Sequence, residues 1–183
     1  MTVTCSPRLV DTDFREDANA SAVIGDADFK MAMRQVASSV AIVTASSGKV
    51  RNGLTATAVC SVTASPPTML VCVNRDASAD KLIAARGAFA INFLTEEQHG
   101  VARLFSTSKL APEERFGEGT WRSLVTGAPV LDGSVASFDC VVADRIIAGT
   151  HHVYFGRIVA VTSLDQHGLL YRDGAFRRLA AID

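Results

Sequence analysis

The chain has 183 residues, of which 48% are hydrophobic and 20% are charged, and its formal net charge is −1. This length suits one domain with a sizeable core, and the composition is that of an ordinary globular protein. It contains no run of Lys or Arg that would indicate nucleic-acid binding, and no apolar segment near the ~20 residues that span a bilayer. We therefore expect neither nucleic acid nor a membrane as a partner.

The cysteines narrow the chemistry further. Cys5, Cys60, Cys72 and Cys140 have no paired spacing, which indicates neither a zinc site nor a disulfide framework. Residues 1–17 also lack the apolar core of a signal peptide. A reduced cytoplasmic setting is therefore the default expectation.

Residues 1–25 are mixed and polar without a period, so we expect an N-terminal arm followed by one domain over residues 26–183. Hydrophobic periodicity and β-branched runs then indicate mostly strands with three helices, without the sustained strand–helix alternation of a doubly wound sheet. The first predicted element is a helix from Asp26 or Asp28 to about residue 37, with Phe29, Met33 and Val36 on one face. Strands over 39–45, 52–65 and 68–74 follow, then a helix over 78–86, a strand over 89–94 and a helix over 95–105. The last predicted strands cover residues 130–147, 152–163, 169–172 and 175–179.

Several of these boundaries have local signals. Ser78 is placed to cap its helix, and Gly87 stands where a helix commonly ends in a left-handed residue. Residues 95–98 match a capping box. Asp173–Gly174 is a strong hairpin signal between the last two strands. Residues 106–129 hold glycines, prolines and charges, and long excursions of this kind are often functional.

The stretch 52–67 is the most distinctive part of the sequence. It is rich in Thr, Ser and Ala and ends at Pro66–Pro67, so we expect an extended strand that forms a hairpin with residues 39–45. Because its side chains are small, a flat aromatic ligand can lie close to its backbone. An interior strand whose neighbour requires small partners explains the same pattern.

These elements favour a mainly β fold, a β-barrel with peripheral helices. The chain contains no glycine-rich dinucleotide fingerprint after a strand, no P-loop and no nucleophile elbow. Cys60 is better explained as a small buried hydrophobic residue than as a nucleophile, because no base stands at a telling position. His151 and His152 are adjacent in a strand and point to opposite faces, so they cannot share a metal ion and one faces inward or into a cleft.

From about residue 29 to residue 179, the chain resembles the short-chain NAD(P)H:flavin oxidoreductases, the reductase components that supply reduced flavin to two-component monooxygenases. It is especially similar to the reductases that serve pyrimidine-ring-opening oxygenases, with those of aromatic hydroxylases as close alternatives. Four pieces in the same order carry the resemblance: residues 36–44; residues 53–61 running on to 65–67; residues 73–78 leading to 89–94; and residues 149–151 followed by 156–159. Residues 114–116, 126–129 and 171–176 also match.

The resemblance implies an FMN-binding split β-barrel that forms a homodimer with the flavin near the subunit interface. It also implies FMN or FAD as the flavin, NADH or NADPH as the hydride donor, and a flavin-dependent monooxygenase as the recipient of reduced flavin. In such an enzyme the cofactor supplies the reactivity, and the protein stacks two rings and places N–H groups around them.

Particular residues match the family's functional positions. His151 matches the residue that helps hold the nicotinamide, and Tyr171 matches a nearby nucleotide contact. Ser78 and Lys81 match the segment that meets the flavin phosphate, which agrees with the attraction of helix N-termini for phosphate. The residues that match the borders of the flavin ring are Asn52 at the edge, Thr55, Ala56, Thr57, Ala58, Cys60, Ser61 and Val62 along the strand, and Arg115 and Phe116 in the following loop.

One departure is visible, because Thr150 stands where the family usually has an Asp that orients the histidine. This departure favours an alternative, a flavin-binding module or sensor on the same barrel without turnover. A third hypothesis is an oxidase of the pyridoxamine-phosphate type on a related barrel. That type requires a basic cluster around a substrate phosphate, and the sequence shows no such cluster.

Overall fold

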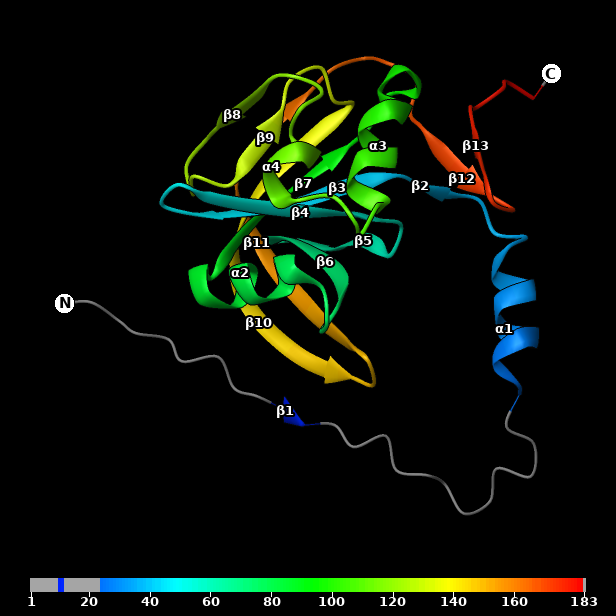
Figure 1. Cartoon of the computed structure of the whole chain (residues 1–183), viewed down its shortest axis with the longest axis horizontal. Coiled ribbons are helices and arrows are strands. Elements are labelled where there is room, and N and C mark those ends of the chain that lie inside the picture. Colours follow the sequence, from blue (N-terminus) through cyan, green and yellow to red (C-terminus); the bar gives the residue numbers. More distant parts are fainter. Residues whose placement is uncertain (1–9, 12–23, 183) are drawn as a thin grey trace.

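The computed structural model describes residues 10–11 and 24–182. Most of the predicted arm over residues 1–25 therefore lies outside the described residues. The described part is dominated by one eight-stranded sheet with helices packed around it (Figure 1). No helix in these residues is long and apolar enough to cross a membrane.

The main sheet follows the order β4-β3-β7-β10-β11-β6-β5, and its neighbours along this path are antiparallel. A short strand, β1 (Val10–Asp11), pairs in parallel with β10. The bounds of the others are β3 Ala41–Ser47, β4 Val50–Ala56, β5 Val59–Ala64, β6 Pro67–Asn74, β7 Ala88–Phe93, β10 Ala136–Ala148 and β11 His151–Ser163. Two small sheets complete the fold, one of β2 (Ser38–Ser39), β12 (Leu170–Arg172) and β13 (Ala175–Arg177), the other of β8 (Trp121–Ser123) and β9 (Pro129–Leu131).

The stretch predicted as one strand over residues 52–65 forms two strands, and this prediction was wrong. β4 pairs with β3 in the expected hairpin, but the chain turns at Thr57 and Ala58 and continues as β5 at the opposite end of the sheet. Three peptide units reach only about 10 Å. The sheet must therefore curl until its two end strands approach each other, which is consistent with the expected split barrel and confirms the mainly β fold class.

Both faces of β3 are buried, because it lies between two layers of core. Ala41, Val43 and Ala45 face the interior of the curled sheet, together with Phe89 and Tyr154. The alternate residues, such as Ile42, face a second cluster that α3 (His99–Ser106) covers. This two-sided burial explains why the segment reads as a continuous apolar run.

Helix α2 (Ser78–Arg86) has the predicted bounds, and Gly87 ends it in the left-handed region with φ 67°. The predicted cap was wrong, however. Ala77 holds the N-cap position, and Ser78 is the first helical residue with no hydrogen bond from its side chain to the helix backbone. The hydroxyl of Ser78 is therefore available for other contacts.

The capping box is confirmed. At a 3₁₀ turn, η1 (Glu96–Gln98), Thr95 accepts a hydrogen bond from the backbone N–H of Gln98, and its own N–H donates to Gln98 Oε1. Helix α3 follows this turn. The Asp173–Gly174 hairpin is confirmed as well, because both residues have positive φ, 49° and 74°, as a two-residue turn of this type requires.

Helix α1 (Asp26–Met33) is shorter than predicted and has no buried residue. It projects away from the sheet (Figure 1), and Phe29 and Met33 on its apolar face are about half exposed. Its C-terminal end is tied to the β12–β13 hairpin, where the backbone N–H of Asp173 donates to the Arg34 carbonyl oxygen at 2.9 Å. Among residues 10–11 and 24–182, nothing buries the apolar face of this helix.

Candidate functional site

A pocket of about 510 Å³ opens between β4, the start of α2, the end of α3 and the short helix α4 (Pro112–Arg115). Its walls include the backbone of Gly53 and Thr55 on β4, and Ala77 and Ser78 where α2 begins. The excursion over residues 106–129, predicted to be functional, supplies the opposite wall through Thr107, Ser108 and Arg115. The first turn of a nine-residue helix thus faces the pocket with backbone N–H groups that have no partner within the helix.

Three predicted residues, Asn52, Ser78 and Arg115, meet beside this pocket. The Nδ2 of Asn52 donates to Ser78 Oγ at 2.8 Å, which joins β4 to the start of α2. The Oδ1 of Asn52 accepts from Arg115 Nη1 at 3.3 Å and from the Gly53 N–H at 2.8 Å. Asn52 is 5% exposed, so it works as a buried linker between the two other side chains.

Arg115 is a buried cation with incomplete hydrogen bonding. It is 9% exposed, and its Nη1 also donates to the Gly53 carbonyl oxygen at 2.9 Å. Its Nε is buried and has no partner among the described residues, and the ion pairs found there do not include Arg115. A buried guanidinium without a carboxylate is costly unless an anion accompanies it. Together with the N-terminus of α2, it makes this pocket suited to a phosphate.

The strip predicted to border the flavin ring divides into inner and outer parts. Thr55 donates its hydroxyl to the Ala102 carbonyl oxygen at 2.7 Å, and the Ala56 side chain lies in the core at 7% exposure. These two residues can therefore offer a ligand mainly their backbone. The exposed members of the strip are Thr57, Ala58, Cys60, Ser61 and Val62, which follow the corner and the edge strand β5. The expectation that Cys60 is buried was wrong, because it lies exposed on this edge strand.

Tyr171 and Thr57 line a second, open depression of about 490 Å³ between α1 and the β12–β13 hairpin. Tyr171 is 39% exposed and packs edge-on against Phe176. Lys30, Arg34 and Arg172 line this depression together with Asp173, whose carboxylate pairs with Arg34 at 3.1 Å. Thr57 therefore connects the predicted ring strip with the predicted nucleotide contact.

Two other predicted residues, Phe116 and Lys81, do not line the pocket between β4 and α2. Phe116 is 5% exposed and packs against Phe105 and Trp121 at ring-centroid distances of 5.0 and 4.9 Å, while the Arg51 guanidinium covers its ring at 4.2 Å. It supports the wall rather than lining it. Lys81 is exposed on α2 and is not among the residues that line the pocket.

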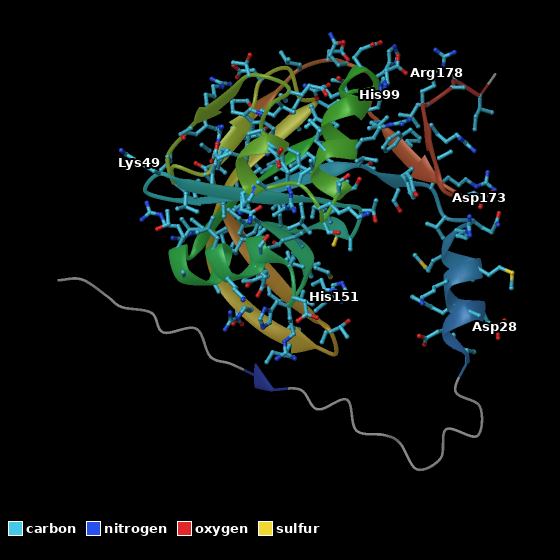
Figure 2. All side chains as sticks on the ribbon, in the orientation of Figure 1. Asp28, Lys49, His99, His151, Asp173 and Arg178 are labelled. Atoms are coloured by element: carbon cyan, nitrogen blue, oxygen red, sulfur yellow. The ribbon has the colours of Figure 1, made fainter. Side chains whose placement is uncertain are left out.

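His151 is the first residue of β11 and is partly exposed at the β10–β11 turn. Its Nδ1 lies 2.9 Å from Thr150 Oγ1, so the threonine that replaces the usual Asp also holds the ring. Figure 2 shows His151 well apart from Asp173, at the tip of the hairpin that carries Tyr171. One chain therefore does not bring its two predicted nucleotide contacts together.

His152 points to the other face of β11, as predicted, and meets Asp80. Asp80 and Tyr154 were not identified from the sequence, since an Asp near a helix start is usually explained by the helix dipole. Among the described residues, no group of three or more His, Cys, Asp or Glu side chains is placed to hold a metal ion.

Comparisons with known proteins agree with this geometry. Residues 33–180 match the model of the flavin reductase like domain. The FMN reductase (NADH) RutF of Yersinia enterocolitica is 42% identical over 160 residues, which cover 87% of each chain. A solved structure from Haemophilus somnus, provisionally described as a flavin reductase, has a TM-score of 0.83 at 38% identity and covers 85% of this chain and all of its own.

A more distant solved structure has the same fold. BorF, the flavin reductase component of a bacterial two-component tryptophan halogenase, has a TM-score of 0.79 at 28% identity and covers 86% of this chain and 100% of its own. The family model spans most of the chain, and the similarity includes the strands, α2 and the loop that carries Arg115. The chain therefore belongs to the flavin reductase like domain family.

Proposed function

We propose that the protein is an NADH-dependent FMN reductase that supplies reduced flavin to a partner monooxygenase. The observation that carries the proposal is the pocket where the unpaired Nε of Arg115, the hydroxyl of Ser78 and the first turn of α2 converge. These groups fit the phosphate of a flavin mononucleotide. The RutF relatives, which are named for FMN and NADH, support this choice of flavin and donor.

From the phosphate pocket, the flavin ring would lie along the exposed corner at Thr57 and Ala58 and along β5. The side chains there are small, and the backbone turns sharply, so a flat ring can approach N–H groups closely. When bound, the flavin and the nicotinamide supply hydride transfer from nicotinamide C4 to flavin N5. The chain itself holds both rings in contact and directs N–H groups toward the pyrimidine edge, where negative charge grows.

We assign His151 to the nicotinamide side of the site. Thr150 fixes the Nδ1 side of the imidazole at 2.9 Å, which leaves Nε2 for the ligand. A threonine hydroxyl carries no charge, so it orients the ring without the electrostatic effect of a carboxylate. The expected role of His151 is accordingly to position the donor.

We also propose a homodimer whose second copy completes the site. Apolar side chains remain exposed on α1, on β5 and on β11. His151 also lies apart from Asp173, at the tip of the hairpin that carries Tyr171 (Figure 2). A second copy that covers β5 would bury these side chains and enclose the flavin ring. Sedimentation of the flavin-bound protein should give the mass of a dimer, and a monomer with flavin bound would contradict this arrangement.

The proposed partner is a flavin-dependent monooxygenase that receives the reduced flavin. The BorF relative is a component of a two-component halogenase, which supports a partner that consumes reduced flavin.

The proposed setting is the cytoplasm. The described cysteines, Cys60, Cys72 and Cys140, are free thiols, in keeping with a reducing cytoplasmic setting.

Steady-state oxidation of NADH with FMN tests the function. We expect turnover with FMN, and a lower affinity for riboflavin, which has the same ring but no phosphate. Tight flavin binding without NADH oxidation would instead identify a flavin-binding module. Equal affinity for FMN and riboflavin would refute the phosphate pocket.

A further inference from the structure

We propose that Asp80 is a positioning residue that locks the first turn of α2 onto β11 and so sets the geometry of the phosphate pocket. This inference rests on the proposed function, because it assigns a role in flavin binding. Asp80 is the third residue of α2, two residues after Ser78 and one before Lys81. It therefore lies in the first turn of the helix, and contacts that hold its side chain also hold the start of the helix.

Asp80 has an unusually complete set of partners for a buried carboxylate. Its side chain is 6% exposed, and its Oδ1 and Oδ2 lie 2.8 and 3.0 Å from His152 Nδ1. The Tyr154 hydroxyl donates to Oδ1 at 2.7 Å. His152 and Tyr154 are two residues apart on β11, so both side chains lie on the same face of the strand and contact the same carboxylate.

Tyr154 is suited to permanent donation. It is fully buried and packs against Phe89 and His152. Burial raises the pKa of the Tyr154 hydroxyl well above its usual value, and the hydrogen bond to Asp80 adds to this rise, while Arg145 partly opposes it. The hydroxyl therefore stays protonated at every pH at which the enzyme would work.

The same contacts connect the two halves of the proposed site. Ser78 and the free N–H groups of α2 face the phosphate pocket, while His152 is the neighbour of His151 on β11. A second link reinforces the arrangement, because the Arg75 N–H donates to the Thr150 carbonyl oxygen at 3.0 Å. Without the Asp80 contacts, α2 would retain Ile83 in the core, but its first turn would lose its anchor to the strand.

The test compares FMN with riboflavin in the full-length protein. Asp80→Asn removes the charge and keeps the shape, so we expect the Kd for FMN to rise about tenfold and the Kd for riboflavin by less than about twofold. A purely structural role for Asp80 would instead lower the melting temperature and leave the preference for FMN over riboflavin unchanged, which would overturn the inference.

A matched control is available in Asp139, a fully buried carboxylate on β10 that accepts hydrogen bonds from the Thr126 N–H and hydroxyl, away from the pocket. Asp139→Asn should lower stability without changing the FMN preference. Tyr154→Phe serves if Asp80→Asn does not fold, because it removes one hydrogen bond to Asp80 and keeps the ring. We expect it to reduce the preference by about threefold, and an unchanged preference in that variant would also overturn the inference.

Failure of the inference can be told apart from failure of the proposed function. If wild-type protein shows no preference for FMN over riboflavin, the phosphate pocket and the role of Asp80 both fail. If the preference exists and depends on Arg115 but survives Asp80→Asn and Tyr154→Phe, only the role of Asp80 is refuted.

Discussion

Replacement of Arg115 by methionine removes the charge and the unpaired Nε while keeping a side chain of similar length. A hydrogen bond to a charged partner contributes about 1.5–3 kcal/mol. At about 1.4 kcal/mol per tenfold, Arg115→Met should raise the Kd for FMN roughly 10- to 150-fold. The Gly53 carbonyl oxygen also loses a donor, at a cost of about 1–3 kcal/mol, which the relief of a buried charge offsets in the flavin-free protein.

Flavin titrations and thermal melts of the flavin-free protein measure these two effects separately. Riboflavin should bind the variant and the wild type with similar affinity, since it lacks the phosphate. Arg51→Met is the matched control, because Arg51 already pairs with Glu113 at 2.9 Å and covers Phe116. Equal loss of FMN and riboflavin affinity in Arg115→Met would refute the assignment of Arg115 to a phosphate.

Three further predictions follow from the same geometry. Ser78→Ala should weaken FMN binding by about 1–2 kcal/mol in titrations. It also removes the acceptor of the buried Asn52 Nδ2, so we expect the flavin-free protein to lose about 1–3 kcal/mol of stability even though Ala77 holds the N-cap; a drop in melting temperature with unchanged FMN affinity would contradict the assignment of Ser78 to the phosphate. In steady-state kinetics, His151→Ala should raise the KM for NADH by a factor that corresponds to about 1–3 kcal/mol and leave the affinity for FMN intact. Wild-type kinetic constants in this variant would refute the assignment of His151 to the nicotinamide. Burial, with a smaller effect of the Asp139 charge, raises the pKa of the Cys140 thiol from 9.0 to about 12. The contribution of this thiol to the free energy of unfolding should therefore be constant below pH 9 and fall above it by about 1.4 kcal/mol per pH unit; denaturant titrations of Cys140→Ala should lack this part of the decline between pH 9 and 10.

Local signals in the sequence predicted much of the fold. The bounds of α2, the capping box at Thr95 and the hairpin at Asp173–Gly174 depend on residues a few positions apart, and the structure has each of them. The corner at Thr57–Ala58 was missed because small and β-branched residues continue through it without a break in pattern. The local sequence pattern is the same for one long strand and for two strands that a corner places at opposite ends of a curled sheet.

Long-range contacts limited what could be predicted of the site. Ser78, Asn52 and Arg115 were selected through the family resemblance, and the structure brings them together across β4, α2 and α4. The contact between Asp80 and His152 spans 72 residues, so no spacing in the sequence could indicate it. The apolar pattern of α1 was recognised, but a pattern does not say that Phe29 and Met33 stay about half exposed.

Anaerobic mixing of NADH with FMN and a small amount of the protein tests the central claim most directly, because oxygen then cannot reoxidise the flavin. The absorbance of oxidised flavin should disappear completely, over many turnovers per protein molecule and at a rate proportional to protein concentration. Flavin that binds to the protein yet stays oxidised at every NADH concentration would contradict the assignment as a flavin reductase.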